Sequence, residues 1–381
     1  MGRGKNRNRL LLILLIVSLI LSLIFAASTG AVKIGAAEII ATITKGHDTV
    51  NASILLDIRF PRVLLAAVLG AGLAAVGGVM QAIFKNPLVD SYTLGMSSGA
   101  ALGAVISIIT GLNVSVLGME TTGIFAFIGA VLTLFFVYSL AYTRNRMSIN
   151  SLLLAGVAVS YFLASVISFL MMLNRDKIEH IVFWTMGSLS MATWDEVFIS
   201  AVLIVPSLIV LLYYTRELNI LVMGEDAAHH LGINTSALKN ILLITCAVIV
   251  GSVVSTGGTI AFLGLVAPHI IRLIVGSDNK RVIPYSALLG SILLILSDTA
   301  GRVLIQPSEI PVGVMTSIMG GPLFIFLLRK QRKRTNVRRH QTLELRRASK
   351  EYPAFWRLAS GIWCPKKCVT RYIYFNISFM H

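Results

Sequence analysis

The sequence predicts an all-α polytopic membrane protein with about ten transmembrane helices and both ends of the chain in the cytoplasm. Of its 381 residues, 56% are hydrophobic and only 13% are charged, whereas a soluble domain carries about 25% charged residues. The apolar residues lie in runs close to the roughly 20 residues that cross a bilayer. Because such runs recur along most of the chain, the composition argues against a soluble enzyme.

Ten apolar runs predict the spans. They cover residues 10–28, 62–83, 91–111, 121–142, 150–173, 195–215, 238–257, 259–275, 283–303 and 311–329. The first follows a basic start and ends in small residues, as a signal peptide does, but it is too long for a typical signal-peptide core, so we expect an uncleaved first helix. Pro268 interrupts the eighth run, which leaves open that this span consists of two pieces.

Small residues recur within several spans. Examples are GAGLAAVGG at 70–78 and GMSSGAALGA at 95–104. Small side chains let helices approach closely in lipid, where helix association gains nothing from the hydrophobic effect. The spans are therefore predicted to pack as a compact bundle.

The distribution of Lys and Arg predicts the orientation of the spans. If the N-terminus is inside, the cytoplasmic connections contain Arg3, Lys5, Arg7, Arg9, Lys85, Arg144, Arg146, Arg216, Lys239, Arg272, Lys280, Arg281 and the basic tail. The outer connections contain fewer: Lys33, Lys45, Arg59, Arg62, Arg175, Lys177 and Arg302. This bias favours both termini in the cytoplasm. It also places three arginines near helix ends on the outer side, against the general trend.

Most of the net charge of +16 comes from the C-terminal tail, which has about fourteen Lys and Arg and two acidic residues from Arg329 onward. Such a tail is typical of a cytoplasmic stop-transfer flank, and we predict no nucleic-acid partner. CPKKC at 364–368 lacks a second cysteine pair and a nearby histidine, so no metal site is predicted there. The adjacent histidines at 229 and 230 point in different directions on a helix, and they too predict none.

The phosphate-binding loop and the metalloprotease motif are absent from the sequence. No phosphate-binding G-x-x-x-x-G-K-[ST] loop occurs, so the chain is not expected to hydrolyse ATP itself. No H-E-x-x-H is present, and no catalytic residue or cofactor is predicted. Asp298 and Arg302 are four residues apart, which favours a local ion pair. A proton relay would need several buried carboxylates or histidines, and the spans offer no such chain.

Six ordered stretches carry a family resemblance. They include IRFPRVLLAAVLGAG in 58–105, LLLAGVAVS at 152–160, WTMGSL at 184–189, GEDAAHHLGI at 224–233, GTIAFLGLVAPHIIRL in 258–302 and EIPVGVMTSIMGGP in 309–330. Together they resemble the permease subunits of bacterial ABC importers for iron–siderophores, haem and cobalamin. The resemblance covers residues from about 10 to 334.

The resemblance implies an architecture and a set of partners. Residues 1–334 would form a multi-pass permease domain in the bacterial cell membrane, in contact with its lipids, and residues 335–381 a poorly ordered basic cytoplasmic extension. A second permease subunit, identical or similar, would complete the path. Two cytoplasmic ABC ATPase subunits would drive it, and an extracytoplasmic substrate-binding protein would deliver the ligand. An iron(III)–siderophore is the expected substrate, with haem or cobalamin as the alternative. A secondary transporter driven by an ion gradient is the alternative of a different class.

The stretch from Gly224 to Gly232 predicts a short helix in a cytoplasmic connection. Acidic residues in its first turn suit the helix dipole, Gly232 ends it, and Ala228 and Leu231 are three residues apart on one face. The resemblance implies that this is the helix that docks into the ATPase, through Gly224, Glu225, Ala228, Leu231 and Gly232. An ordinary amphipathic loop helix is the alternative.

KNPLVD at 85–90 predicts a cytoplasmic turn in which Pro87 breaks the helix. The resemblance implies that Asn86 and Leu88 help to close the cytoplasmic end of the path. Ser148 and Asn150, in the turn before the fifth span, would lie near them. Ile149 departs from the small hydroxyl residues usual in the family at that turn.

The three outer arginines match a further family feature. The resemblance implies that Arg59, Arg62 and Arg302 form a basic pocket on the outer surface that receives glutamates of the binding protein. Guanidinium groups suit this role because they stay charged and bind carboxylates in two-point geometry. The alternative is that these arginines anchor the helix ends to lipid headgroups.

Overall fold

The computed structural model describes residues 2–30, 35, 50–90, 92–112, 115–116, 119–143, 146–147, 149–305, 308–326 and 329. Two units are distinguished, Met1–Pro322 and Leu323–His381, and the account below concerns the first. Ser148 and the predicted extension 335–381 lie outside the described residues.

Helices make up nearly all of the described chain. In order they are α1 Gly2–Ser28, α3 Val50–Ser53, a π-helix Ile54–Arg59, α4 Phe60–Ile83, a 3-10 turn Tyr92–Leu94, α5 Met96–Thr110, α6 Thr121–Ala141, α7 Ile149–Leu173, a 3-10 turn Arg175–Lys177, α8 Ile178–Thr185, α9 Trp194–Tyr213, α10 Thr215–Met223, α11 Glu225–His230, α12 Thr235–Gly257, α13 Leu263–Val275 and α14 Asn279–Leu304. A final helix covers Val312–Phe326. Where the chain is described, strands occur only as two-residue pairs, β1 Ser115–Val116 with β2 Met119–Glu120 and β3 Tyr142–Thr143 with β4 Arg146–Met147.

The predicted ten spans all have a counterpart among the described helices. Seven helical segments are long and apolar enough to cross a membrane: Asn6–Ser28, Asn51–Ile83, Thr121–Ala141, Asn150–Leu173, Trp194–Tyr213, Thr235–Gly257 and Asn279–Leu304. Three shorter apolar helices, Met96–Thr110, Leu263–Val275 and Val312–Phe326, correspond to the third, eighth and tenth predicted spans. The all-α membrane fold class is confirmed.

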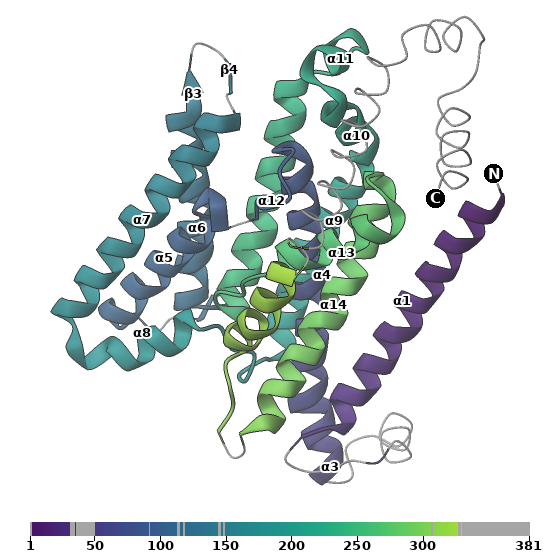
Figure 1. Ribbon diagram of the computed structural model, residues 1–381. Helices are drawn as coiled ribbons and strands as arrows, with labels where there is room; N and C mark the ends of the chain where they lie inside the picture. The colour runs from purple at the N-terminus through teal and green to yellow at the C-terminus, as the bar shows by residue number, and fades with distance from the viewer. Residues whose placement is uncertain are drawn as a thin grey trace, which may run out of the picture. The chain divides into compact units, whose positions relative to one another are not determined.

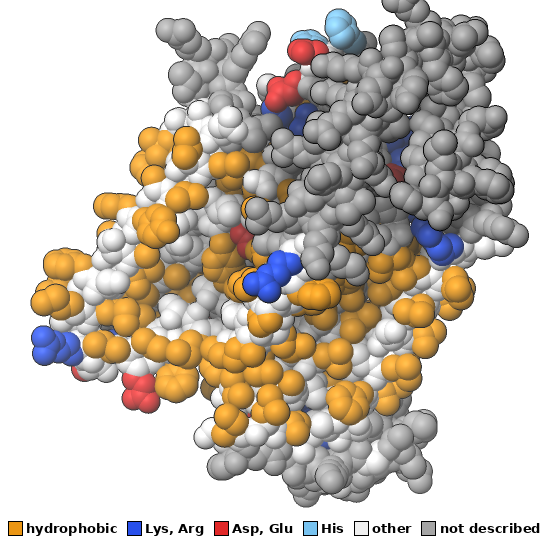
Figure 2. All heavy atoms as spheres, in the orientation of Figure 1, with side chains coloured by type: hydrophobic (Ala, Val, Ile, Leu, Met, Phe, Trp, Pro, Cys, Tyr) orange, Lys and Arg blue, Asp and Glu red, His pale blue; other side chains and the backbone are white. Residues whose placement is uncertain are grey.

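Within this unit α4 is the central helix. It packs against α14, α13, α9 and α12, and 78% of its most apolar stretch is buried, against 17% for α7. Hydrophobic side chains cover much of the described surface in Figure 2, as expected for helices that face lipid. The central and peripheral helices are thus distinguished by burial although all are apolar.

Glycines allow the closest helix contacts, as the small-residue pattern predicts. A Cβ atom at Gly70 in α4 would lie 2.5 Å from the carbonyl oxygen of Gly290 in α14. One at Gly77 would collide with the backbone of Gly264 at the start of α13. Because the two backbones touch at these points, any larger side chain would push the helices apart.

The eighth span differs from its prediction. We expected it to begin near residue 259, but α13 begins at Leu263, and Pro268 lies inside one helix rather than between two pieces. Residues 258–262 are not helical, and Phe262 has a positive φ of 67°. Pro268 has no N–H to donate to the Gly264 carbonyl four residues earlier, and the Gln81 side chain donates to that carbonyl instead, at 3.3 Å.

The two ends of the bundle can be followed in Figure 1. The start of α1, the β3–β4 pair and α10–α11 lie at one end, and α3, the start of α4 and α8 lie at the other. The connections that were predicted to be cytoplasmic and those that were predicted to be outside therefore lie at opposite ends of the bundle. Pro61 lies in the first turn of α4, the position that proline favours.

Candidate functional site

Arg62 is the centre of an ionic cluster at the α3 end of the bundle. Its Nε lies 3.0 Å from both carboxylate oxygens of Asp298, and its Nη2 lies 2.9 Å from Asp298 Oδ1. Its Nη1 lies 2.9 Å from Oε2 of Glu309. Asp298 comes from α14 and Glu309 from the segment that follows it, so this cluster joins elements more than 230 residues apart. Such two-point pairing fixes the guanidinium plane.

Arg302 and Arg59 complete the cluster and contact the end of α1. Arg302 Nε lies 3.3 Å from Asp298 Oδ2, which confirms the predicted local ion pair. Arg302 Nη2 donates to the carbonyl of Ala26 at 3.2 Å, and Arg59 Nη1 donates to that of Ala27 at 2.8 Å. The last carbonyls of a helix lack helical partners and carry partial negative charge. The end of α1 therefore helps to hold two of the cations.

The three predicted docking arginines are thus brought together, but they are not free side chains on the surface. Each is less than 9% exposed, and each is held by carboxylates or carbonyls of this chain. The sequence analysis identified Asp298 only as the local partner of Arg302 and did not identify Glu309. No spacing rule would have found Glu309, because its partner Arg62 lies 247 residues away.

The predicted ATPase-docking segment forms α11 at the opposite end of the bundle. Gly224 and Gly232 have φ angles of 145° and 77°, which favour glycine. Ile233 donates its N–H to the Ala228 carbonyl at 3.0 Å, as in the usual left-handed helix ending. Acidic and histidine side chains gather at this end in Figure 2.

The two residues predicted to share a face, Ala228 and Leu231, differ in burial. Ala228 is fully buried, whereas the side chain of Leu231 is 66% exposed. The helix ends at His230, and Leu231 is the first residue with non-helical angles, although its N–H still donates to the Ala227 carbonyl at 3.3 Å. Leu231 is left as an apolar group exposed beside the acidic and histidine side chains.

Two polar contacts join the α10–α11 segment to the bundle. Lys239 in α12 contacts Glu225 of α11, with 2.6 Å between Nζ and Oε1. Asn219 in α10 donates to Asp278 at 2.8 Å and accepts the N–H of Asn279 at 2.9 Å, at the start of α14. A movement of this segment would therefore be transmitted to both α12 and α14.

The predicted gate turn is ordered by its own polar groups. The Asn86 side chain accepts the N–H of Leu88 at 3.0 Å, and Leu88 is exposed. Asn150 is exposed at the start of α7. The 3-10 turn after the gate packs on α7, since a Cβ at Gly156 would lie 2.9 Å from Leu94 Cα. Where the chain is described, no hydrogen bond joins Asn86 or Leu88 to Asn150.

Asp90 is a buried carboxyl group next to this turn. It accepts the N–H groups of Tyr92 at 3.1 Å and Thr93 at 3.2 Å. These bonds favour the charged form, but burial outweighs them and raises the pKa of Asp90 to about 6. The sequence analysis did not single out this residue.

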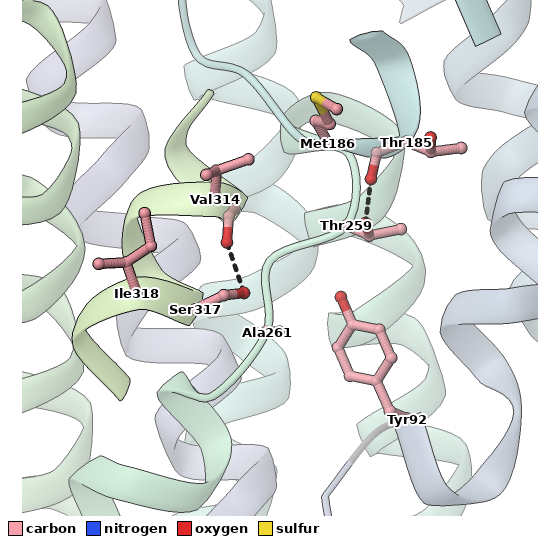
Figure 3. A pocket seen from close by; sticks show the side chains of 9 residues that line it. Tyr92, Thr185, Met186, Thr259, Ala261, Val314, Ser317 and Ile318 are labelled. Atoms are coloured by element: carbon pink, nitrogen blue, oxygen red, sulfur yellow. Dashed lines mark hydrogen bonds between the residues drawn. The ribbon is translucent and has the colours of Figure 1, made fainter. Parts of the chain in front are cut away.

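A pocket of about 360 Å³ lies between the 3-10 turn at Tyr92, the end of α8, the non-helical segment before α13 and the final helix (Figure 3). Its lining is Tyr92, Thr185, Met186, Thr259, Ala261, Gly313, Val314, Ser317 and Ile318. The Thr259 hydroxyl donates to the Thr185 carbonyl, and the Ser317 hydroxyl donates to the Gly313 carbonyl at 2.7 Å. The pocket is therefore mainly apolar with a few hydroxyl groups. Its residues fall within the stretches that carry the family resemblance, but the sequence assigned them no role.

Metal chemistry is not indicated by the described part of the chain. No group of three or more His, Cys, Asp or Glu side chains there could hold a metal ion. Cys246 is buried as a free thiol, and CPKKC lies outside the described residues.

Comparisons with known proteins agree with this architecture. The model of the FecCD transport family matches residues 14–330. An uncharacterized ABC transporter permease protein of Bacillus subtilis is 40% identical over 75% of this chain and 81% of its own. The hemin transport system permease protein of Yersinia pestis is 36% identical over 87% and 98%. A solved metal-chelate type ABC transporter in an inward-facing conformation has a TM-score of 0.74 and 28% identity, covering 84% of this chain and 99% of its own.

The family model covers most of the chain, and the two permease relatives above are matched over 81% and 98% of their own lengths. Permeases of this family work with ABC ATPases and substrate-binding proteins. The chain belongs to the FecCD transport family and is a multi-pass permease of an ABC importer.

Proposed function

We propose that this chain is the permease subunit of an importer for iron(III)–siderophores in the bacterial cell membrane. The observation that carries the proposal is the family match across the bundle, in which the arginine cluster and α11 lie at opposite ends. Relatives include a probable siderophore permease at 34% identity and an iron-uptake permease at 33%, both of Bacillus subtilis. A second permease subunit, identical or similar, completes the path.

Haem or cobalamin is the second candidate substrate. The hemin permease matches 98% of its own length, and the cobalamin import permease of Halobacterium salinarum is 40% identical over 73% of this chain. The test is uptake by proteoliposomes that contain the permease, ATPase subunits and binding protein, supplied in turn with a radio-iron hydroxamate siderophore, hemin and cobalamin. Saturable uptake of hemin or cobalamin without uptake of the siderophore would replace the first candidate.

The same proteoliposomes separate an ABC importer from an ion-driven transporter. Uptake is expected to require the ATPase subunits and ATP. Uptake by the permease alone, driven by a proton or sodium gradient, would overturn the proposal.

The role proposed for α11 is to dock into the ATPase. It is supported by Leu231, an apolar side chain exposed at the end of a short polar helix. Leu231→Ser removes this contact, and Gly232→Val strains a backbone that requires a positive φ. Both variants are expected to lose uptake while ATP hydrolysis continues. Unchanged uptake in both would remove the assignment.

The role proposed for Arg59, Arg62 and Arg302 is to receive carboxylates of the binding protein. It is supported by the grouping of the three arginines at one end of the bundle, where the Glu309 side chain that contacts Arg62 is 41% exposed. Arg59→Glu is the cleanest single test, because Arg62 and Arg302 also hold Asp298 and their reversal would disturb the fold. We expect weaker docking for Arg59→Glu and the weakest for the triple reversal. Normal docking by a folded triple variant would exclude this surface.

The role proposed for Asn86, Leu88, Ser148 and Asn150 is to close the cytoplasmic end of the path. It is supported by the exposure of Leu88 and by the packing on α7 of the 3-10 turn Tyr92–Leu94 that follows. Leu88→Ser is expected to raise substrate leak through the idle importer, and no change in leak would argue against a gate there.

A further inference from the structure

We propose that Glu309 is an internal placeholder for the partner's carboxylate, which occupies Arg62 in the free permease and is displaced when the binding protein docks. The proposal rests on the docking function proposed above. It explains how arginines that are buried and paired could still receive a partner.

The guanidinium group of Arg62 has one closed side and one open side. Its Nε and Nη2 contact Asp298, whose side chain is 2% exposed. Its Nη1 contacts Glu309 at 2.9 and 3.1 Å, and the Glu309 side chain is 41% exposed. A carboxylate that arrives from outside can therefore reach only the position of Glu309.

The two contacts also differ in strength. Breaking a buried pair on one side leaves an uncompensated charge, whereas a pair with a half-exposed member contributes little, because water can solvate that member. Exchanging Glu309 for another carboxylate keeps the charge of the cluster unchanged. Displacing Glu309 from Arg62 therefore costs less free energy than displacing Asp298.

Release of Glu309 would affect the helix that follows it. Ile310 donates its N–H to the Gly301 carbonyl at 3.1 Å, and Val314 donates to the Pro311 carbonyl at 3.1 Å. A Cβ at Gly313 would collide with the carbonyls of Met186 and Thr259. The start of Val312–Phe326 is therefore packed tightly, and this same helix lines the pocket through Val314, Ser317 and Ile318 (Figure 3). Docking at Arg62 would loosen the wall of that pocket.

The test is the affinity of the importer's own binding protein for the permease–ATPase complex in nanodiscs. Glu309→Gln removes the competing carboxylate, and we expect docking to become about two- to five-fold tighter. Asp195→Asn is the matched control, because Asp195 is an exposed carboxylate in the first turn of α9, predicted on the same side. It is expected to leave the affinity unchanged. A purely structural role for Glu309 predicts the opposite sign, that is, weaker docking.

Two outcomes separate this proposal from the docking function itself. If Arg59→Glu weakens docking while Glu309→Gln leaves it unchanged or weaker, the placeholder is overturned and the docking surface stands. If neither variant changes the affinity, the docking surface fails as well.

Hydrogen exchange provides a second measurement that does not depend on affinity. Amides of residues 312–318 should exchange faster when the binding protein docks, and faster in Glu309→Gln without it. Unchanged exchange on docking would overturn the link to the pocket. Equal melting temperatures of the variant and the wild type would show that the bundle itself is intact.

Discussion

Asp298 and Asp90 are both buried carboxyl groups, but their partners differ. Asp298, 2% exposed, receives guanidinium groups from Arg62 and Arg302. Asp90, 7% exposed, receives neutral N–H groups from Tyr92 and Thr93. Charged donors compensate burial far better than neutral ones. Burial alone therefore does not identify a charged functional site, and the partners must be known.

The two ends of the bundle differ in how deeply the members of their ion pairs are buried. At the arginine end both members of the central pair are buried. At the α11 end Lys239 is 3% exposed while its partner Glu225 is 50% exposed. Pairs that are closed on both sides fix structure, whereas pairs that are open on one side can respond to a partner protein. The variants below test this distinction.

Asp298→Asn should have the largest effect. It removes the shared partner of two buried arginines, and we expect a loss of about 3–5 kcal/mol in the free energy of unfolding. Denaturant titration in detergent would measure it. Glu309→Gln is the control, expected to cost less than about 1 kcal/mol. Equal losses in the two variants would contradict the difference between the closed and the open side of Arg62.

Asp90 should make stability depend on pH. Burial raises its pKa from 3.8 to about 6, so the folded state binds the proton more tightly than the unfolded chain. The resulting stabilisation is complete below about pH 4 and is lost as the pH rises to about 6, by at most about 3 kcal/mol. Asp90→Asn should remove this dependence. Parallel pH profiles for the wild type and the variant would show that Asp90 does not titrate in this range.

The sequence predicted the bundle well because each span is a single contiguous apolar segment, which can be identified without knowledge of its neighbours in space. All ten predicted spans have counterparts, and the glycine-rich stretches do mark the closest contacts, such as Gly70 with Gly290. The candidate sites could be predicted less well from the sequence. The three arginines could be grouped only through the family resemblance, and their burial depends on Glu309 and the end of α1, which no local pattern connects to them. Leu231 was predicted together with Ala228, but their spacing alone could not show that Ala228 is buried and Leu231 exposed.

The pair of Glu225 and Lys239 should respond asymmetrically. Glu225→Gln leaves a buried ammonium without its charged partner, and we expect a loss of about 2 kcal/mol. Lys239→Gln leaves only a half-exposed carboxylate, which water can solvate, and should cost clearly less. Thermal unfolding of the two variants would measure the difference. Equal losses of stability in the two variants would mean that the exposure of Glu225 does not reduce its need for a charged partner.

Asn219→Ala should have the smallest effect on stability and a separate effect on coupling. It removes two hydrogen bonds between α10 and the start of α14, at a net cost of about 1 kcal/mol. If these bonds transmit the movement of α11 to α14, the binding protein should stimulate ATP hydrolysis less in the variant, while basal hydrolysis stays unchanged. Asn240→Ala is a suitable control, because Asn240 accepts a hydrogen bond from Tyr138 at 2.9 Å within the bundle. Equal stimulation in Asn219→Ala and the wild type would leave Lys239 and Glu225 as the link through which α11 acts.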